Sequence, residues 1–430
     1  MELLIILFGT FFALAFFGVP VAYALGSATM LGMLFAGVPL TSLPQKMFTA
    51  IDSFSFMAIP FFILAGKLME LGGISKRLVR LADALLSKIR GGLAIATVVA
   101  CAFFAALSGS APGTVAAIGS VMYPEMKKLG YDEEFAAGLI TISGGLGPII
   151  PPSIVMVTLG VTTGISISSM FMGGLLVGII LAACLIFCAY IICVKKGYGG
   201  SKEAFSFRKV FSAFISAIPA LGMPIIILGG IYGGIFTPTE AAVVSVVYAL
   251  FVGFFVYHEL TWKSLVDIFY SSSISSCTIL MIIALSVPFS WIFARQGSAT
   301  LIVNFASSVL TTPIAFLLAL YVILLIFGTF MEANAIVLLL MPFLYPISQQ
   351  LGIDPIHFGV MSSVALVIGT ATPPVAVNIY TAIGVTKLPL TRVVRGMMPF
   401  FLTMVFLTLV LLFFPQVSYP VNHRSMEKTI

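Results

Sequence analysis

The sequence has very few charged residues for its length, and this shortage excludes a soluble globular protein. Asp, Glu, Lys and Arg together make up 8% of the 430 residues, whereas 60% are hydrophobic. A soluble domain of this length exposes far more polar surface to water than such a composition provides. Apolar stretches long enough to cross a hydrocarbon core of roughly 30 Å recur along the chain. The composition therefore predicts an all-α polytopic membrane protein embedded in a lipid bilayer.

Histidine and cysteine are also scarce, which argues against metal and enzyme chemistry. Neither the three histidines nor the five cysteines have the spacing of metal ligands. Ser108-Gly-Ser110 resembles a nucleophile turn, but no nearby His/Asp pair would activate the serine. No Walker A pattern is present. The net charge of +6 comes from bases in short loops, where it indicates membrane orientation and no binding of nucleic acid. We expect no enzyme activity.

Apolar segments separated by basic loops predict about 10–12 membrane spans. Residues 75–90 are typical of a basic amphipathic helix on the cytoplasmic surface, and residues 258–271 are its counterpart. The basic loop 195–209 is cytoplasmic by the positive-inside rule and separates two halves. Uninterrupted spans are expected within 3–35 (two spans), at 48–69, 168–193, 211–232, 238–257 and 273–293, and in a last span that ends near Phe414.

Two further spans, 134–164 and 357–385, are interrupted in mid-membrane at corresponding positions. The first interruption reads Gly-Leu-Gly-Pro-Ile-Ile-Pro-Pro-Ser from Gly145, and the second reads Gly-Thr-Ala-Thr-Pro-Pro from Gly369. Adding 222 to a position in the first gives its equivalent in the second, and about nine identities follow this offset. Broken helices in corresponding halves are the best sequence indication of a secondary transporter's binding site.

Each half also contains an apolar stretch whose two parts are too short to cross the membrane. These stretches, 92–128 and 300–348, are broken at 108–113 and 328–334, which predicts two re-entrant hairpins. The first hairpin ends in Lys127-Lys128 and the second in Gln349-Gln350. By the positive-inside rule the hairpins enter from opposite sides, so the repeat has inverted topology.

Polar side chains around the breaks are mostly neutral oxygen donors. Ser108, Ser110, Thr114, Ser143 and Ser153 accompany the first break, and Thr329, Asn334, Thr370, Thr372 and Asn378 the second. Such donors, with unwound carbonyl groups, suit Na⁺, and the free N–H groups of a helix start suit an anion. Glu332, at the second hairpin tip, is open to three interpretations: a cation ligand, a proton-coupling group or a hairpin stabiliser.

Three segments carry a resemblance to a known family. With 108–114, 144–153 and 371–378, the chain resembles the large membrane subunit of tripartite ATP-independent periplasmic (TRAP) transporters. The resemblance covers essentially the whole chain, and within the family the chain is most similar to the sialic-acid members. It implies an elevator-type, Na⁺-driven importer of organic anions in the bacterial inner membrane. It also implies a small four-helix membrane subunit, here a separate polypeptide, and a periplasmic substrate-binding protein.

The resemblance also implies ligand sets for two or more Na⁺ ions. The second hairpin tip reads Met-Glu-Ala-Asn-Ala and not Ser-Gly-Ser, which departs from strict symmetry. The first Na⁺ set would be Ser108, Gly109, Ser110, Gly147, Pro148 and Pro151. The second would be Gly328, Met331, Thr370, Thr372 and Pro373. Substrate-binding candidates are Ser108, Ser153, Glu332, Asn334 and Asn378.

The alternatives concern the substrate and the coupling ion. Sialic acid is favoured, C4-dicarboxylates are the alternative substrates, and a stand-alone proton-coupled carrier is the alternative mechanism. The predicted organisation has five parts: scaffold spans with an arm helix (1–90), a first transport half (91–193), a linker with scaffold spans and a second arm helix (194–272), a second transport half (273–414) and a polar tail (415–430).

Overall fold

Every secondary-structure element in the described part of the chain is a helix. The computed structural model describes residues 2–86, 89–198, 206–295, 310, 312–373 and 376–418. Helices satisfy backbone hydrogen bonds locally, as an apolar chain needs where water is excluded. The predicted all-α polytopic class is therefore confirmed.

The helices fall before and after the basic linker. Before it lie α1 (Glu2–Phe16), α2 (Val21–Phe35), α3 (Ser42–Ile51), η1 (Phe54–Met57), α4 (Ala58–Leu71), α5 (Ile74–Leu86), α6 (Gly92–Ser108), α7 (Ala111–Lys128), α8 (Glu133–Gly144), α9 (Ile154–Thr163) and α10 (Ile167–Lys196). After it lie α11 (Phe207–Tyr232), α12 (Pro238–Phe251), η2 (Val252–Val256), α13 (Trp262–Arg295), α15 (Pro313–Gly328), α16 (Ala333–Gln350), α17 (Pro355–Gly369), α18 (Val377–Thr386), α19 (Leu390–Leu412) and η3 (Pro415–Val417).

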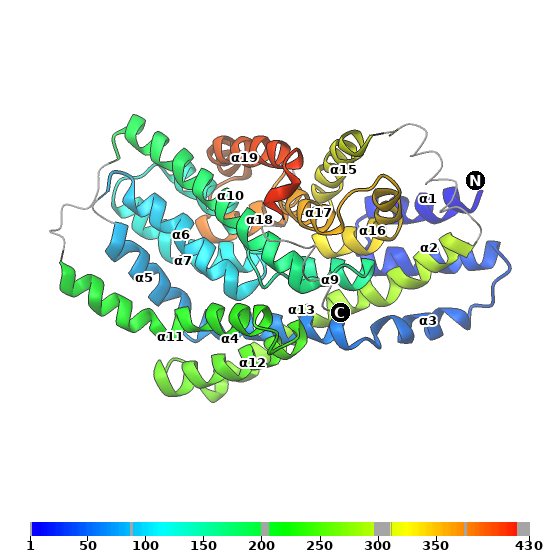
Figure 1. The fold of residues 1–430 in the computed structure, drawn as a ribbon, viewed down its shortest axis with the longest axis horizontal. Helices are drawn as coiled ribbons and strands as arrows, with labels where there is room; N and C mark the ends of the chain where they lie inside the picture. Colours follow the sequence, from blue (N-terminus) through cyan, green and yellow to red (C-terminus); the bar gives the residue numbers. More distant parts are fainter. Residues whose placement is uncertain are drawn as a thin grey trace.

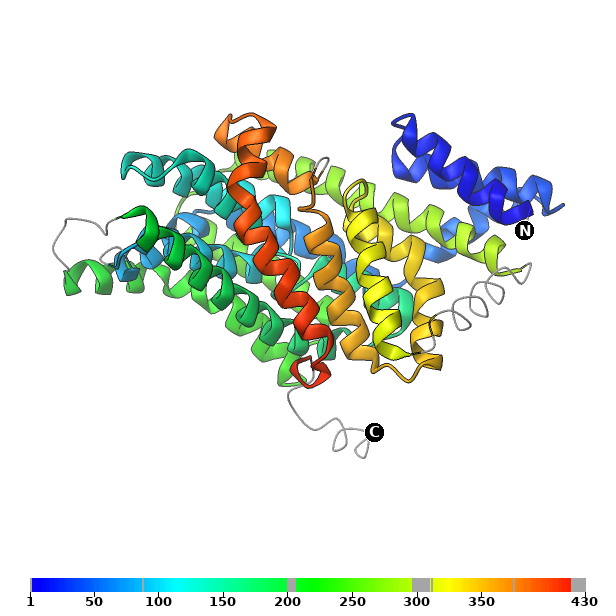
Figure 2. The same ribbon diagram turned by 90° about the horizontal axis from the view of Figure 1, so that it is seen from above.

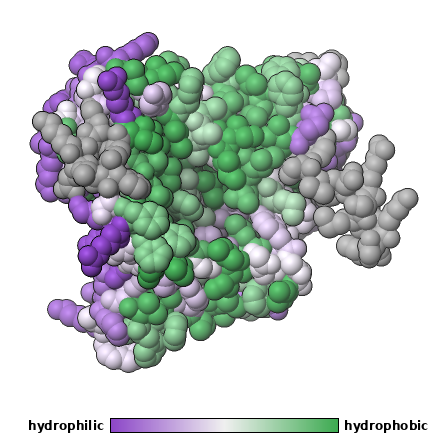
Figure 3. Space-filling view, turned by 60° about the vertical axis from the view of Figure 1, so that its left-hand side comes forward, coloured by the Kyte–Doolittle hydropathy of each residue, from purple (hydrophilic) through white to green (hydrophobic). Residues whose placement is uncertain are grey.

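Long apolar helices are combined with half-length ones. Among the described residues, six helical stretches are long and apolar enough to cross a bilayer: 54–71, α10, α11, 238–256, α13 and α19. The shorter apolar helices include α9 of the first predicted broken span and both parts, α17 and α18, of the second. The surface presents a broad hydrophobic face with hydrophilic residues towards its edges (Figure 3), as expected for a protein surrounded by lipid.

Two predicted boundaries are wrong. The span predicted at 48–69 begins at Phe54, because α3 ends at Ile51 and the polar pair Asp52-Ser53 interrupts the helix. The predicted surface helix 258–271 and span 273–293 are joined in one 34-residue helix, α13, which begins at Trp262. Its serine hydroxyls donate to carbonyls within the preceding turn, so the polar run stays helical. The predictions for residues 300–309, Pro374 and the tail beyond residue 418 lie outside the described residues.

The internal repeat is visible in the positions of the helices. Helix α16 begins and ends 222 positions after α7, and α17 begins 222 positions after α8. Equivalent aspartates cap α8 and α17: the Asp132 carboxylate accepts from the N–H groups of Glu134 and Phe135, and Asp354 accepts from those of Ile356 and His357. The same local hydrogen bonding therefore starts the broken span in each half.

Helix α19 shows that the two halves are inverted. At its start, Arg392 donates to Glu134, at the start of α8, over 2.9 Å. At its far end, the carbonyl of Leu412 lies 3.3 Å from the ring of His357, at the start of α17. Helix α19 has 23 residues and is therefore about 35 Å long. The broken spans α8–α9 and α17–α18 therefore begin on opposite sides of the protein.

The hairpins accordingly approach the centre from opposite directions. In Figure 1, α6 and α7 lie on one side and α15 and α16 on the other; α18 packs beside α7, and α9 packs beside α16. Helices α1 and α2 form a separate pair at one end of the molecule, where α2 packs on α13 (Figure 2). This arrangement points both hairpin tips towards the middle of the fold.

Candidate functional site

Both hairpin tips and both helix breaks meet at one central cavity of about 100 Å³. Predicted site residues from both halves line it: Gly109, Ser110, Pro148, Glu332, Asn334, Thr370 and Asn378. The other predicted residues do not line it, namely Ser108, Gly147, Pro151, Ser153, Gly328, Met331, Thr372 and Pro373. The fold thus joins segments that are more than 200 positions apart in the sequence.

The first hairpin tip concentrates three oxygen atoms. The hydroxyls of Ser108 and Thr114 lie 2.9 Å apart, and both donate to the Ser110 carbonyl, over 3.3 Å and 2.8 Å respectively. Gly109 has a φ of +59°, which a residue without a side chain adopts most easily. The Ser110 hydroxyl accepts from the Gly113 N–H and caps α7. The tip therefore presents a compact cluster of neutral oxygens.

The first break packs directly on this oxygen cluster. A methyl group added at Gly147 would lie 2.6 Å from the Ser110 carbonyl oxygen, so only glycine permits this approach. Ser153 is fully buried; its hydroxyl donates to the Pro148 carbonyl over 2.5 Å and caps α9 by accepting from the Met156 N–H. Pro151 is joined to Pro152 by a cis peptide bond. The cavity wall is thus supported by three residues that do not line it: Gly147, Pro151 and Ser153.

The second hairpin tip is built around Glu332. This residue lies 222 positions after Ser110 and has the same task, because it caps α16. Its carboxylate accepts from the backbone N–H groups of Asn334 (2.9 Å) and Ala335 (3.3 Å) and from the Asn334 side chain (2.7 Å). The side chain is exposed and lines the cavity. Of the described cavity-lining residues, Glu332 alone carries a charge.

The second break is held by close backbone contact and local hydrogen bonds. Gly328, at the end of α15, lies against Gly369, at the end of α17. Thr370 and Thr372 donate their hydroxyls to carbonyls of the preceding turn, over 2.8 Å and 2.9 Å. Nearby, Met331 is buried and Pro373 is half-buried. The hydroxyl oxygens therefore keep lone pairs that a cation can use.

Asn378 has no hydrogen-bond partner for its carboxamide among the described residues. It is fully buried, in the first turn of α18, and it lines the cavity. A buried polar group without a partner costs free energy, so such a group at a cavity indicates a ligand. Asn334 differs, because its carboxamide oxygen accepts from the Thr158 hydroxyl over 3.0 Å. That bond joins the second hairpin to the first broken helix.

Sequence reasoning missed several residues at this site, among them Thr158 and Ile279. Thr158 lies one turn inside α9, and its polar side chain on a buried apolar helix is a signal that could have revealed it. Ile279 lines the cavity from α13, which is outside both hairpins and both broken spans. No motif marks Ile279, because an isoleucine in an apolar helix is ordinary.

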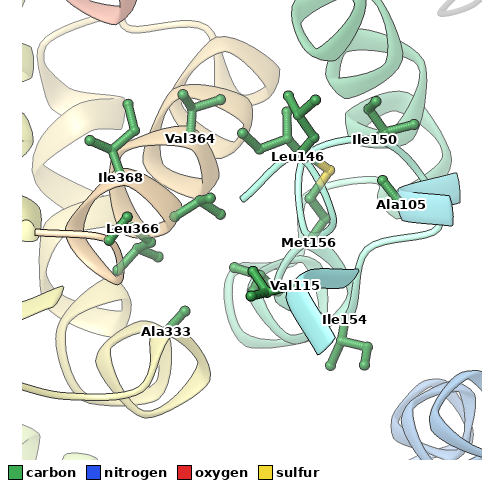
Figure 4. Close-up of a cluster of buried hydrophobic side chains, with 14 of the residues drawn as sticks. Ala105, Val115, Leu146, Ile150, Ile154, Met156, Ala333, Val364, Leu366 and Ile368 are labelled. Atoms are coloured by element: carbon green, nitrogen blue, oxygen red, sulfur yellow. The ribbon is translucent and has the colours of Figure 1, made fainter. Parts of the chain in front are cut away.

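Buried apolar side chains enclose the breaks. Figure 4 shows Leu146 and Ile150 of the first break on one side and Val364 and Ile368 of α17 on the other; all four are buried. Non-helical backbone at membrane depth is tolerated when protein surrounds it in this way. The low local polarity also strengthens each hydrogen bond and each dipole at the cavity.

Comparison with known proteins agrees with this architecture. The family model "Tripartite ATP-independent periplasmic transporter, DctM component" matches residues 8–417. The C4-dicarboxylate TRAP transporter large permease protein DctM of Rhodobacter capsulatus is 40% identical, over 96% of this chain and 97% of that protein. The sialic acid TRAP transporter large permease protein SiaM of Vibrio cholerae is 34% identical, over 90% of this chain and 95% of its own length.

A solved structure shares the fold at low sequence identity. The crystal structure of the Alcanivorax borkumensis YdaH transporter, described as having an unusual topology, matches with a TM-score of 0.58 and 14% identity. The match covers 86% of this chain and 87% of that one. The protein is a transporter subunit of the bacterial inner membrane and not an enzyme, and it belongs to the tripartite ATP-independent periplasmic transporter family as its large membrane (DctM) component.

Proposed function

We propose that this subunit imports an organic acid anion together with Na⁺, by an elevator movement of the hairpins and broken helices. One observation carries the proposal: the first turns of four helices, α7, α9, α16 and α18, line the central cavity. Each helix start has a partial positive charge and outward N–H groups, so four of them favour an anion without any basic side chain.

The start of α18 is the best anchor for the substrate's acid group. Side chains of Ser110, Ser153 and Glu332 cap the other three helices, whereas α18 has no side-chain cap. The unpaired carboxamide of Asn378 lies in that same first turn. Its two N–H donors can bind a carboxylate that the helix start also attracts.

Neutral oxygens on both sides of this anchor support Na⁺ coupling. The cluster of Ser108, Ser110 and Thr114 offers hydroxyl and carbonyl oxygens beside the first break. Thr370 and Thr372 offer hydroxyl oxygens at the second break. Hard oxygen ligands without net charge suit a monovalent cation, and a bound cation would in turn attract the anion. Two Na⁺ ions flanking one anion is the expected arrangement.

The inverted repeat supports alternating access by an elevator movement. Both hairpins carry part of the cavity wall, whereas Ile279 belongs to the long helix α13. Movement of the hairpins and broken helices past α13 would uncover the cavity on one side and then on the other. Ile279 would then act as a fixed barrier that the substrate passes.

The relatives and the size of the cavity support a proposal for the substrate class. The relatives described above are named for C4-dicarboxylates and sialic acid, both of which carry carboxylates. The cavity of about 100 Å³ is smaller than the roughly 300–1,000 Å³ of pockets for drug-sized ligands. This size favours a small acid such as a C4-dicarboxylate over the nine-carbon sialic acid preferred from the sequence.

The family also indicates two protein partners. A small four-helix membrane subunit would extend the fixed scaffold, and a soluble periplasmic protein would deliver the anion. Both proposals rest on family membership, since the chain matches the large component of a tripartite system.

Uptake into proteoliposomes containing both membrane subunits tests the proposal. We expect radiolabelled C4-dicarboxylate to accumulate only with an inward Na⁺ gradient and the substrate-loaded binding protein outside. Full-rate uptake without the Na⁺ gradient and without the binding protein would contradict the proposal. Uptake driven by a proton gradient alone would also contradict it. Accumulation of sialic acid and not of the dicarboxylate would keep the mechanism and reject the substrate class.

Two substitutions test the Na⁺ sites in the same assay. Ser110→Ala and Thr372→Ala should each raise the Na⁺ concentration that gives half-maximal uptake. Thr403→Ala is the control, because Thr403 makes the same backward hydroxyl bond as Thr372 but lies on α19, away from the cavity. An unchanged Na⁺ dependence would remove the substituted hydroxyl from the ligand set.

A further inference from the structure

A second, larger cavity lies between α5 and α11, on the side of the basic loops. Its volume is about 650 Å³. Four basic side chains line it together with serines and two alanines: Arg77, Arg80, Arg208, Lys209, Ser206, Ser212, Ser216, Ala84 and Ala213. No acidic residue is among the described residues of this lining. The transport mechanism proposed above uses none of these residues.

One wall of this basic cavity is rigid. The Arg77 guanidinium donates to the Gly73 carbonyl (2.8 Å) and to Glu259 (2.7 Å), and it stacks 3.6 Å from the ring centre of Tyr257. The Tyr257 hydroxyl in turn donates to the carbonyl of Ser216, on α11. These contacts fix α5 against α11 and hold the cavity open. Glu259 pairs with Arg77 and also with Lys76, and these bonds hold the Arg77 guanidinium in the wall.

Two arginines remain available for a ligand. Arg80 and Arg208 are both exposed, and neither has an ion-pair partner among the described residues. They come from different helices and line the same cavity, so one bound anion could contact both. Guanidinium groups with neighbouring serine hydroxyls are the donors that bind phosphate oxygens well.

The adjacent face of α11 indicates what else the ligand carries. Its exposed apolar residues recur at helical spacing and form one stripe: Phe207, Phe211, Phe214, Ile215 and Ile218. The residues that line the cavity, Arg208, Ser212 and Ser216, each lie one position after a member of this stripe. A basic cavity and an apolar stripe side by side fit a molecule with a phosphate head and long hydrocarbon chains.

We propose that this cavity binds the phosphate headgroup of an anionic phospholipid from the cytoplasmic leaflet. The head lies between Arg80 and Arg208, and the acyl chains run along the stripe from Phe207 to Ile218. Basic pockets between membrane helices on the cytoplasmic side are suited to such headgroups. The lipid ties α5 to α11, at a site distinct from the central cavity.

Native mass spectrometry of the full-length chain tests the site with phosphatidylglycerol, phosphatidylcholine and inorganic phosphate as probes. The double variant Arg80→Gln/Arg208→Gln should bind phosphatidylglycerol about 30-fold more weakly, the loss expected for two basic side chains near an anionic lipid. The control Lys195→Gln/Lys263→Gln removes equal charge from exposed residues outside the cavity and should change binding less than about threefold. Ser212→Trp, which fills the cavity and keeps every charge, should also abolish tight binding.

Four results would overturn the proposal. Equal loss in the control variant would mean general surface attraction. Unchanged phosphatidylglycerol binding by the double variant and by Ser212→Trp would mean that the lipid binds elsewhere. Displacement of the lipid by millimolar inorganic phosphate, or equal binding of phosphatidylcholine, would show that an anionic lipid is not the specific ligand. An unchanged melting temperature in lipid-free detergent confirms that each variant is folded.

Discussion

Replacing Glu332 separates the three roles that its position allows. All three hydrogen bonds of the carboxylate go to the hairpin's own groups, namely two backbone N–H groups and the Asn334 side chain. The equivalent residue of the first hairpin, Ser110, caps its helix without any charge. We therefore predict that Glu332 stabilises the hairpin and that serine can replace it.

The expected magnitudes follow from those bonds. Glu332→Ala removes the helix cap, at about 0.5–2 kcal/mol. It also leaves the amide of Asn334, which is 4% exposed, without its acceptor, at about 1–3 kcal/mol. The sum is about 3 kcal/mol of lost stability. Glu332→Ser restores the cap and should recover about 1 kcal/mol of this loss.

Thermal unfolding in detergent and uptake in proteoliposomes measure the two consequences. Glu332→Ala should unfold at a clearly lower temperature than Glu332→Ser, which should lie between the alanine variant and the parent. Glu332→Ser should also keep the parent's pH profile of uptake and its half-saturating Na⁺ concentration. A serine variant that is as stable as predicted, yet loses Na⁺ dependence or shifts its pH profile, would show that the carboxylate takes part in coupling.

Three further predictions concern the wall, the ion pairs and the anion anchor. Gly147→Ala should weaken Na⁺ affinity at least tenfold, because its methyl group would lie 2.6 Å from the Ser110 carbonyl. The hydrogen bond from Lys127 lowers the pKa of Glu133. The ion pair between these residues therefore stabilises the fold at neutral pH, and this stabilisation is lost as the pH falls through the lowered pKa of Glu133. In the variant Glu133→Gln, the melting temperature should therefore fall less steeply as the pH is lowered into the acidic range. Asn378→Leu should weaken substrate binding, measured by titration calorimetry, without lowering the melting temperature, because its amide has no partner to lose among the described residues.

Each of these predictions has a control or an opposing result. Gly9→Ala should leave Na⁺ affinity unchanged, since a methyl group there meets open space. A fall as steep in Glu133→Gln as in the parent would mean that other carboxylates dominate it. If Asn378→Leu binds substrate normally, the anion is anchored elsewhere.

Several features of the fold were predictable because they depend on local sequence. The equivalence of Asp132 with Asp354 follows from one constant offset, and the structure places both aspartates in equivalent helix caps. The same offset pairs Gly147, which lies in the first break, with Gly369, which is the last residue of α17. The first hairpin ends in two lysines (Lys127-Lys128) and the second in two glutamines (Gln349-Gln350). This difference predicted the inversion, because basic residues stay on the cytoplasmic side. The contacts of α19 with both broken spans agree.

Other features required the folded chain. A serine run within α13 is polar enough to resemble a loop, and only its hydrogen bonds to the preceding turn show that the helix continues. The hydrogen bond between Thr158 and Asn334 joins positions 176 residues apart, and no pattern in either segment predicts it. The entry of Ile279 into the cavity depends on how α13 packs, which an apolar residue type does not reveal.

The sequence by itself determined the membrane class, the two hairpins, the two broken spans and the inverted repeat. Hydrophobicity, glycine and proline positions and loop charge act over short distances, so they can be read along the chain. Only the tertiary structure decided that four helix starts converge on one cavity, that the Glu332 carboxylate accepts hydrogen bonds from its own hairpin, and that the Asn378 carboxamide has no partner among the described residues. Those facts depend on distances between segments that are far apart in sequence, and packing alone sets such distances.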